Sequence, residues 1–243
     1  MTFPKAYLGV KKIFTAHILG LIGAVLLLLT SVFSAINVVD QLNNVLNATT
    51  TREYFGIAST WLAIAGSVLL LISIVLYLVG IIRAKADERS FLGAMIFAII
   101  LLVVSPIVAI INILVPASTS FPASYKVFFS ILQNAAILAT AIFTIHGIQS
   151  LAKKLDRKDI AKKGTVTIVL LIVLYSLIIV STILSIASVI ALSINLSSES
   201  SSTNVLGAFL SSGLILVIAS ILSVVATIIY LIFLKKSVRM LEA

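Results

Sequence analysis

Long uncharged apolar stretches alternate with short polar segments along the whole chain. Six stretches are long enough for the roughly 20 helical residues that cross a bilayer core. Transmembrane helices satisfy their backbone groups internally, and the alternation typical of barrel strands is absent from the sequence. The pattern therefore predicts an all-α integral membrane protein of six transmembrane helices, arranged as three hairpins in one domain (1–243). The predicted spans are 13–39, 54–82, 91–115, 127–150, 165–193 and 205–234.

Composition excludes the soluble classes. Of 243 residues, 61% are hydrophobic and 10% are charged, whereas soluble domains carry about 25% charged residues. A water-soluble enzyme, a nucleic-acid-binding domain and a disordered chain are therefore excluded. The sequence contains no cysteine, which removes disulfides and thiolate metal sites. The first apolar stretch exceeds the 7–15 residues of a signal-peptide core, so we expect it to remain as a helix.

The distribution of charge predicts the orientation. Of the 17 Lys and Arg residues, all but Arg52 and Lys126 lie on the side of the predicted spans that also holds both termini. Basic residues accumulate on the cytoplasmic side of membrane proteins. We therefore expect a multi-pass protein of the cell (plasma) membrane with both termini in the cytoplasm. Insertion then accounts for the net charge of +9 without a nucleic-acid partner.

The predicted spans contain no Asp, Glu, Lys or Arg. Intramembrane ionisable residues usually mark proton relays, ion-coupled transport and voltage sensing. No H-E-x-x-H motif is present either. We therefore predict no catalytic residue, no enzyme activity, no metal and no cofactor.

Two histidines lie at a similar predicted depth near the cytoplasmic ends of their spans. His17 follows Lys12 and His146 precedes Lys153. Two such imidazoles could ligate a haem between two helices. The alternative, which we favour, places both histidines at the interface, where they reach toward headgroups or water.

Four neutral amides fall at outer-leaflet depth: Asn37, Asn112, Gln133 and Asn134. They could form a solute site or hydrogen-bond between helices, and we favour the hydrogen bonds. Proline removes a backbone donor, so Pro106 predicts a kink in the third span.

Small residues recur on one face of the fifth span. Ser181, Ser185 and Ser188 share that face, and Ala219 and Ser223 are four apart on the sixth span. Small residues let helices approach closely, so this pattern predicts a packing seam, with a pore lining as the alternative.

The segment 151–164 is strongly basic. Leu151, Leu155 and Ile160 could dip into the bilayer while the basic side chains contact anionic lipid headgroups. The favoured alternative is a solvated face produced by the positive-inside bias. The basic residues concerned are Lys153, Lys154, Arg157, Lys158, Lys162 and Lys163.

Three short outer loops are expected, at 40–53, 116–124 and about 194–204. Asn47 and Asn195 each begin an N-x-[ST] sequon on or beside these loops. Both are therefore candidate glycosylation sites.

Residues 54–97 read YFGIASTWLAIAGSVLLLISIVLYLVGIIRAKADERSFLGAMIF. The succession of an aliphatic helix, Gly80, a short charged loop and a new apolar helix resembles an uncharacterised archaeal family of polytopic membrane proteins, a domain of unknown function. The resemblance implies a membrane protein of six or a similar number of helices with no assigned activity. It transfers no functional residue.

Two functions remain after these exclusions. We expect a non-catalytic structural or accessory subunit that packs against other membrane proteins or against itself. The alternative is a transporter or channel component for a small neutral or lipid-like solute, with a water-accessible cavity that reaches Gln133 and Asn112. The remaining expected contacts are the bilayer and anionic headgroups on the cytoplasmic side.

Overall fold

The computed structural model describes residues 3–47, 54–114, 122–195 and 202–242, without the side chains of 31, 34–56, 108–127, 130, 182 and 184–221. These described residues form six helices and no strand. In chain order, the helices are α1 (Pro4–Asn47), α2 (Tyr54–Lys85), α3 (Phe91–Leu114), α4 (Pro122–Lys154), α5 (Lys158–Asn195) and α6 (Ser202–Glu242). The prediction of an all-α chain is confirmed.

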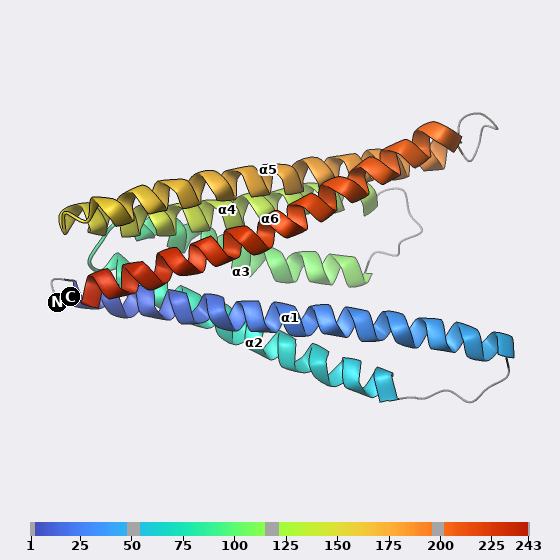
Figure 1. The fold of residues 1–243 in the computed structure, drawn as a ribbon, viewed down its shortest axis with the longest axis horizontal. Helices are drawn as coiled ribbons and strands as arrows, with labels where there is room; N and C mark the ends of the chain where they lie inside the picture. Colours follow the sequence, from blue (N-terminus) through green and yellow to red (C-terminus); the bar gives the residue numbers. More distant parts are fainter. Residues whose placement is uncertain (1–2, 48–53, 115–121, 196–201, 243) are drawn as a thin grey trace.

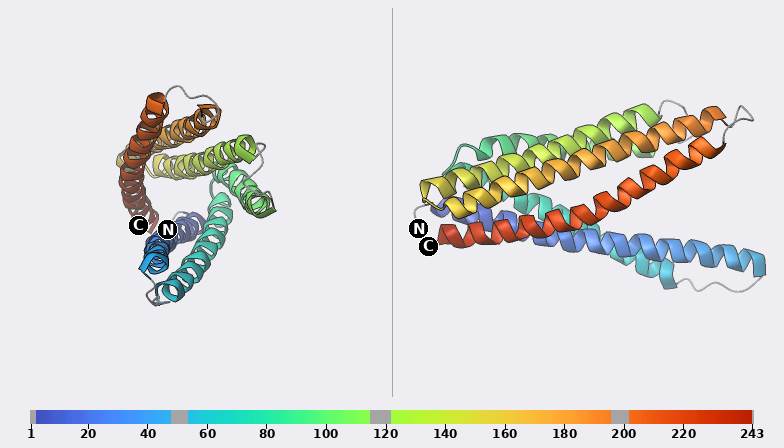
Figure 2. Two further views of the ribbon diagram at one scale, coloured as in Figure 1. Left: turned by 90° about the vertical axis from the view of Figure 1, so that its right-hand side faces the viewer. Right: turned by 45° about the horizontal axis from the view of Figure 1, so that its top comes forward.

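The helices pair as three antiparallel hairpins, and both termini lie at one end of the bundle (Figure 1). The hairpins are α1–α2, α3–α4 and α5–α6, and further contacts join α4 to α5, α1 to α6 and α2 to α3. Near the termini α6 lies beside α1, and away from the termini it lies beside α5 but no longer beside α1 (Figures 1 and 2). The α1–α2 hairpin therefore diverges from α5 and α6 with distance from the termini.

Within the described residues, four helical segments are long and apolar enough to cross a membrane. They are Pro4–Thr30, Ile57–Lys85, Ile131–Lys154 and Lys158–Ser181, and Phe91–Ile107 is a shorter apolar segment. Every predicted span lies within its helix over the described residues, and residue 115 at the end of the third span lies outside them. The predicted loop at 40–53 is wrong over 40–47, which continue α1 as helix. Asp40 ends the apolar stretch, but a polar residue does not interrupt the backbone hydrogen bonds of a helix.

Glycine, alanine and serine at seven-residue spacing form the seam between α1 and α2. Gly66, Ser73 and Gly80 on α2 are each seven residues apart, a repeat that keeps one face of a helix toward its partner. They face an equally spaced set of small residues on α1. One direct contact between the two sets is the 2.7 Å hydrogen bond that Ser73 Oγ donates to the Ala16 carbonyl. The antiparallel pairs are Gly9 with Gly80, Ala16 with Ser73, and Gly23 with Gly66.

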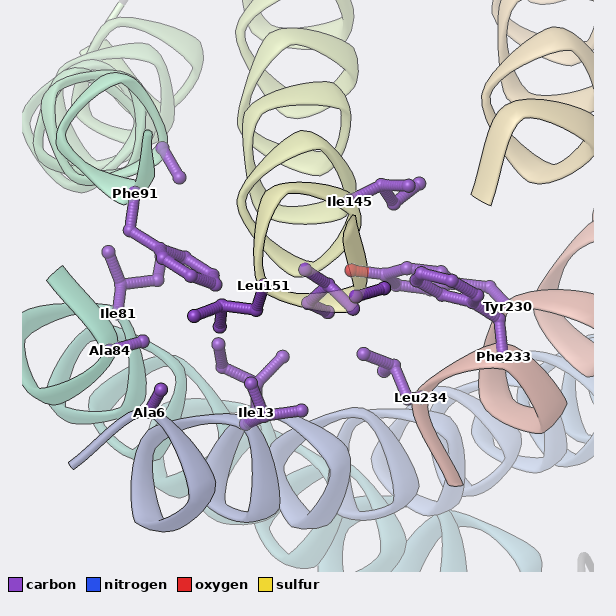
Figure 3. Packing of buried hydrophobic residues seen from close by; sticks show 14 of the residues in the cluster. Ala6, Ile13, Ile81, Ala84, Phe91, Ile145, Leu151, Tyr230, Phe233 and Leu234 are labelled. Carbon is purple, nitrogen blue, oxygen red and sulfur yellow. The ribbon is translucent and has the colours of Figure 1, made fainter. Parts of the chain in front are cut away.

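The hydrophobic core lies at the end of the bundle that holds the termini (Figure 3). Its largest fully buried side chains include Phe91 of α3 and Phe233 of α6. Leu151 and Ile160 are also buried in this cluster, and Leu155 packs against it. The interpretation that Leu151 and Ile160 dip into the bilayer is therefore wrong, because their side chains are covered by the other helices of the same chain. Leu155 is only half-buried.

The loop between α2 and α3 joins three helices. Asp87 Oδ2 accepts a hydrogen bond of 2.7 Å from the Ala6 backbone N–H in the first turn of α1. Such a carboxylate satisfies a donor that the helix leaves free and interacts favourably with the positive end of the helix dipole. The carboxylate of Glu88 is buried and lies 2.6 Å from Lys154 Nζ at the end of α4. The loop thus holds the start of α1 and the end of α4 in place.

The turn between α4 and α5 contains a residue with left-handed backbone. Asp156 has a φ of 52°, and the Arg157 N–H donates to the Ala152 carbonyl at 2.8 Å. Together with the bond from Asp156 N–H to the Lys153 carbonyl, this is the Schellman arrangement that ends many helices. Asp156 occupies the position that usually favours glycine.

Candidate functional site

An imidazole and two tyrosines meet inside the bundle. The ring of His17 on α1 lies edge-to-face with Tyr230 on α6, with centroids 4.8 Å apart. On its other side it lies edge-to-face with Tyr77 on α2, at 5.3 Å. His17 follows the core residue Ile13 by one helical turn, so this imidazole–tyrosine cluster lies one turn farther from the end of the bundle that holds the termini.

Hydrogen bonds fix the direction of donation within the cluster. Thr144 Oγ1 on α4 donates to the Thr140 carbonyl at 2.8 Å, because a carbonyl oxygen only accepts. Its proton is therefore used, and the 2.9 Å contact between Tyr77 Oη and Thr144 Oγ1 is a donation from the tyrosine. By the same argument, His17 Nδ1–H donates to the Ile13 carbonyl at 3.0 Å. This tautomer leaves the lone pair on His17 Nε2.

The hydroxyl of Tyr230 is the most weakly held member of the cluster. Tyr230 is buried, and its Oη interacts with the Tyr77 hydroxyl but forms no hydrogen bond of ordinary geometry with a described residue. Figure 3 shows the side chain reaching from α6 toward α4. The cluster therefore combines an imidazole lone pair with a buried hydroxyl that lacks a well-formed hydrogen bond, an arrangement suited to hydrogen bonding.

The two histidines occupy different environments. His17 packs between the tyrosines, whereas His146 is exposed on α4. The exposure of His146 fits an interfacial side chain. The inward packing of His17 does not fit the interfacial interpretation, because depth in a span does not determine which way a side chain points. Haem ligation by this pair stays the less favoured hypothesis. Within the described part of the chain, no group of three or more His, Asp or Glu residues could hold a metal.

The structure supplies partners for part of the predicted amide set. Gln133 Nε2 donates to Ser105 Oγ at 3.3 Å and so links α4 to α3. Asn134 is half-buried on α4. The side chains of Asn37 and Asn112 lie outside the described set, as do those of the sequon residues Asn47 and Asn195, which end α1 and α5.

The predicted seam on α5 is described at one position. Ser181 is fully buried on a helix that packs against α6, and its hydroxyl has no hydrogen-bond partner in the described regions. The side chains of Ser185, Ser188 and Ala219 lie outside those described. Burial of Ser181 supports close packing at this position.

The basic residues of 151–164 differ in their contacts. Lys154 pairs with Glu88 at 2.6 Å, Arg157 with Asp159 at 3.5 Å and Lys158 with Asp156 at 3.9 Å. The other three members of the predicted headgroup set, Lys153, Lys162 and Lys163, are exposed and have no ion pair in the portions described.

Glu88 carries the most strongly perturbed carboxyl outside the predicted spans. Burial acts to raise its pKa, but hydrogen bonds from Lys154, Ser90 and Ser150 outweigh this effect and lower the pKa to about 2. Ser90 donates through both its hydroxyl and its backbone N–H. Glu88 is therefore ionised at every physiological pH, as a structural ion pair requires.

Sequence reasoning did not identify the tyrosines of the cluster or Thr144. One signal in the sequence could have found them. They are polar residues within otherwise apolar stretches, and they lie at similar distances from the basic ends of those stretches. No family model, curated protein or solved structure matches this chain. The candidate site consequently stands on its own geometry.

Proposed function

We propose that the chain is a multi-pass protein of the plasma membrane with cytoplasmic termini, and that it is a non-catalytic accessory subunit. Its partner in this proposal is the transmembrane region of another membrane protein. Long apolar helices support the membrane location. The cytoplasmic orientation draws support from the bundle end with the termini, which carries every Lys and Arg whose side chain is described, whereas Lys126 lies near the start of α4 at the other end.

One observation carries the accessory role. A continuous row of large apolar side chains on α2 is exposed over about five helical turns, and the exposed fraction of Trp61 is 68%. The α1–α2 hairpin is closely packed within itself and diverges from α5 and α6, so its outer part offers apolar surface on several sides. Contiguous exposed apolar surface of this extent is typical of interaction sites. The row comprises Ile57, Trp61, Ile64, Val68, Leu71 and Val75.

Site-specific photo-crosslinking in native membranes tests this role. A photoreactive amino acid in place of Trp61 should give one discrete protein adduct of reproducible mass. The matched control replaces Val169, which has 55% exposure on α5, and should give lipid adducts. Equal lipid labelling at both positions, with a monomer in mild detergent and no co-purifying chain, contradicts the accessory role. Release of the chain by alkaline carbonate contradicts the membrane location.

The transporter alternative requires a water-accessible cavity that reaches Gln133. The hydrogen bond from the Gln133 amide to Ser105 instead supports a role in helix packing. Because the chain has no cysteine, a Gln133→Cys variant reports access directly. Protection from an aqueous thiol reagent is the result expected of an accessory subunit, and rapid labelling favours the transporter.

A further inference from the structure

The charge pattern at the ends of α5 and α6 leaves several described lysines without an anion, and Lys163 and Lys236 are among them. Every described carboxylate side chain is already engaged: Asp87 with Ala6, Glu88 with Lys154, Asp156 with Lys158, Asp159 with Arg157, and Glu242 with Tyr7. Lys163 and Lys236 are exposed and form no ion pair with any described residue. These two side chains therefore have free donor capacity.

Lys163 lies near the start of α5 and Lys236 near the end of α6, so the antiparallel pairing of these helices places both at the same end of the hairpin, where their side chains are close enough to interact. The adjacent Lys163 lowers the pKa of Lys236 through its hydrogen-bonding contact and its charge, and the carboxylate of Asp159 opposes this effect. Two ammonium groups only donate hydrogen bonds, so neither can accept from the other when both are charged. An anion with several acceptor oxygens would satisfy both groups.

Two apolar rows lead away from this lysine pair along neighbouring helices. On α5, Val166, Val169 and Val173 are each about half exposed and share a face with Lys163. On α6, the row that begins at Lys236 has similar exposure. Its members are Ile232, Ile228 and Val225. Because α5 and α6 are antiparallel, both rows run from the cytoplasmic end toward the outer end.

From this arrangement we infer that the α5–α6 surface binds an anionic phospholipid, with the phosphate between Lys163 and Lys236 and the acyl chains along the two apolar rows. Charge complementarity selects the headgroup, and the apolar rows distinguish a lipid from a free anion. The inference rests on the proposed membrane location, but it does not depend on the accessory role. It assigns one place on the cytoplasmic surface rather than a general attraction of basic residues to the membrane.

Lipid binding to the purified full chain in neutral detergent tests the inference. Phosphatidylglycerol should bind more tightly than phosphatidylcholine with identical acyl chains, as measured by native mass spectrometry and by the shift in melting temperature. In Lys163→Gln/Lys236→Gln, the affinity for phosphatidylglycerol should fall about 30-fold, since each basic residue contributes roughly fivefold. The Lys163→Arg/Lys236→Arg variant should retain the affinity.

The control removes the same charge elsewhere. Lys85→Gln/Lys153→Gln takes away two other cytoplasmic lysines without ion pairs in the described segments, and it should bind phosphatidylglycerol like the unmodified chain. Equal losses in both double variants, or no loss in either, overturn the inference. An equal melting shift with inorganic phosphate alone also overturns it, because the site is then an anion site without a lipid. Failure of the membrane location is detected separately by carbonate extraction.

Discussion

Gly9 and Gly80 face each other across the α1–α2 seam with no room for a side chain on either. A Cβ placed on Gly9 would lie 2.5 Å from the Gly80 carbonyl oxygen, and one placed on Gly80 would lie 2.7 Å from Ile13 Cγ1. Fourteen residues further along α1, a Cβ on Gly23 would lie 3.0 Å from the Gly66 carbonyl oxygen. The backbones of the first hairpin thus approach closely at two points, which fixes the register of one helix on the other.

Gly80→Leu should destabilise the protein by about 2 kcal/mol or more, because overpacking a filled contact costs roughly 1–3 kcal/mol. The measurement is thermal or denaturant unfolding in detergent. Ala65→Leu adds volume at an exposed position of the same helix and should change stability by less than about 0.5 kcal/mol. Similar values for both variants would show that the seam is not closely packed.

Glu88→Gln should remove a pH-dependent part of the stability. The folded-state pKa of about 2 lies below the ordinary value of 4.5, so the ionised carboxylate stabilises the fold above pH 4.5, and this contribution is lost as the pH falls toward 2. Half of the Lys154 side chain is exposed, which screens the pair, so we expect about 1–3 kcal/mol.

Unfolding of the unmodified chain and of Glu88→Gln at several pH values measures this difference. The stability gap between them should be widest at neutral pH and should close between about pH 4.5 and pH 2. Asp159→Asn, which breaks an exposed pair, should produce a gap below about 1 kcal/mol. A gap for Glu88→Gln that does not change with pH would contradict the assigned ion pair.

Tyr77→Phe and Tyr230→Phe should have opposite effects. Tyr77 donates to Thr144, so its loss should cost about 1 kcal/mol. The Tyr230 hydroxyl is buried without a well-formed hydrogen bond to a described residue, and its removal should be neutral or stabilising, because an unsatisfied buried group costs about 1–3 kcal/mol. Equilibrium unfolding of both variants supplies the comparison. A loss above 1 kcal/mol for Tyr230→Phe would mean that a bound water or ligand accepts its proton.

Asp156→Gly should stabilise the turn between α4 and α5. A non-glycine residue at a φ of 52° pays a steric penalty that glycine avoids, and a gain of about 0.5–1 kcal/mol is expected. The lost contact with Lys158 spans 3.9 Å between two highly exposed side chains and should contribute little. The melting temperature in detergent reports the sum. Asp156→Ala, which keeps a Cβ, should show no gain.

Helix positions were predictable because charged residues bracket the apolar stretches. The contacts between helices were harder to predict than their positions. Nearly every position of a long apolar stretch is apolar, so the face that packs against a neighbouring helix hardly differs in hydrophobicity from the other faces. The seam of α2 was visible in the sequence as the seven-residue spacing of Gly66, Ser73 and Gly80. This spacing becomes apparent when small residues are considered apart from large apolar ones. His17 and His146 have similar depths in the sequence, but their directions depend on rotation about each helix. Leu151 and Ile160 were obscured by the lysines around them, although the core buries both.

The ion pair at the base of the bundle also constrains the order of assembly during synthesis. Glu88 and Lys154 are 66 positions apart in the chain, so the carboxylate leaves the ribosome before its partner has been made. The first two helices have all their seam residues by then and can associate before the fourth helix is complete. The α2–α3 loop must wait for the end of the fourth helix, and closure of the bundle at the end that holds the termini is accordingly a late event in biogenesis.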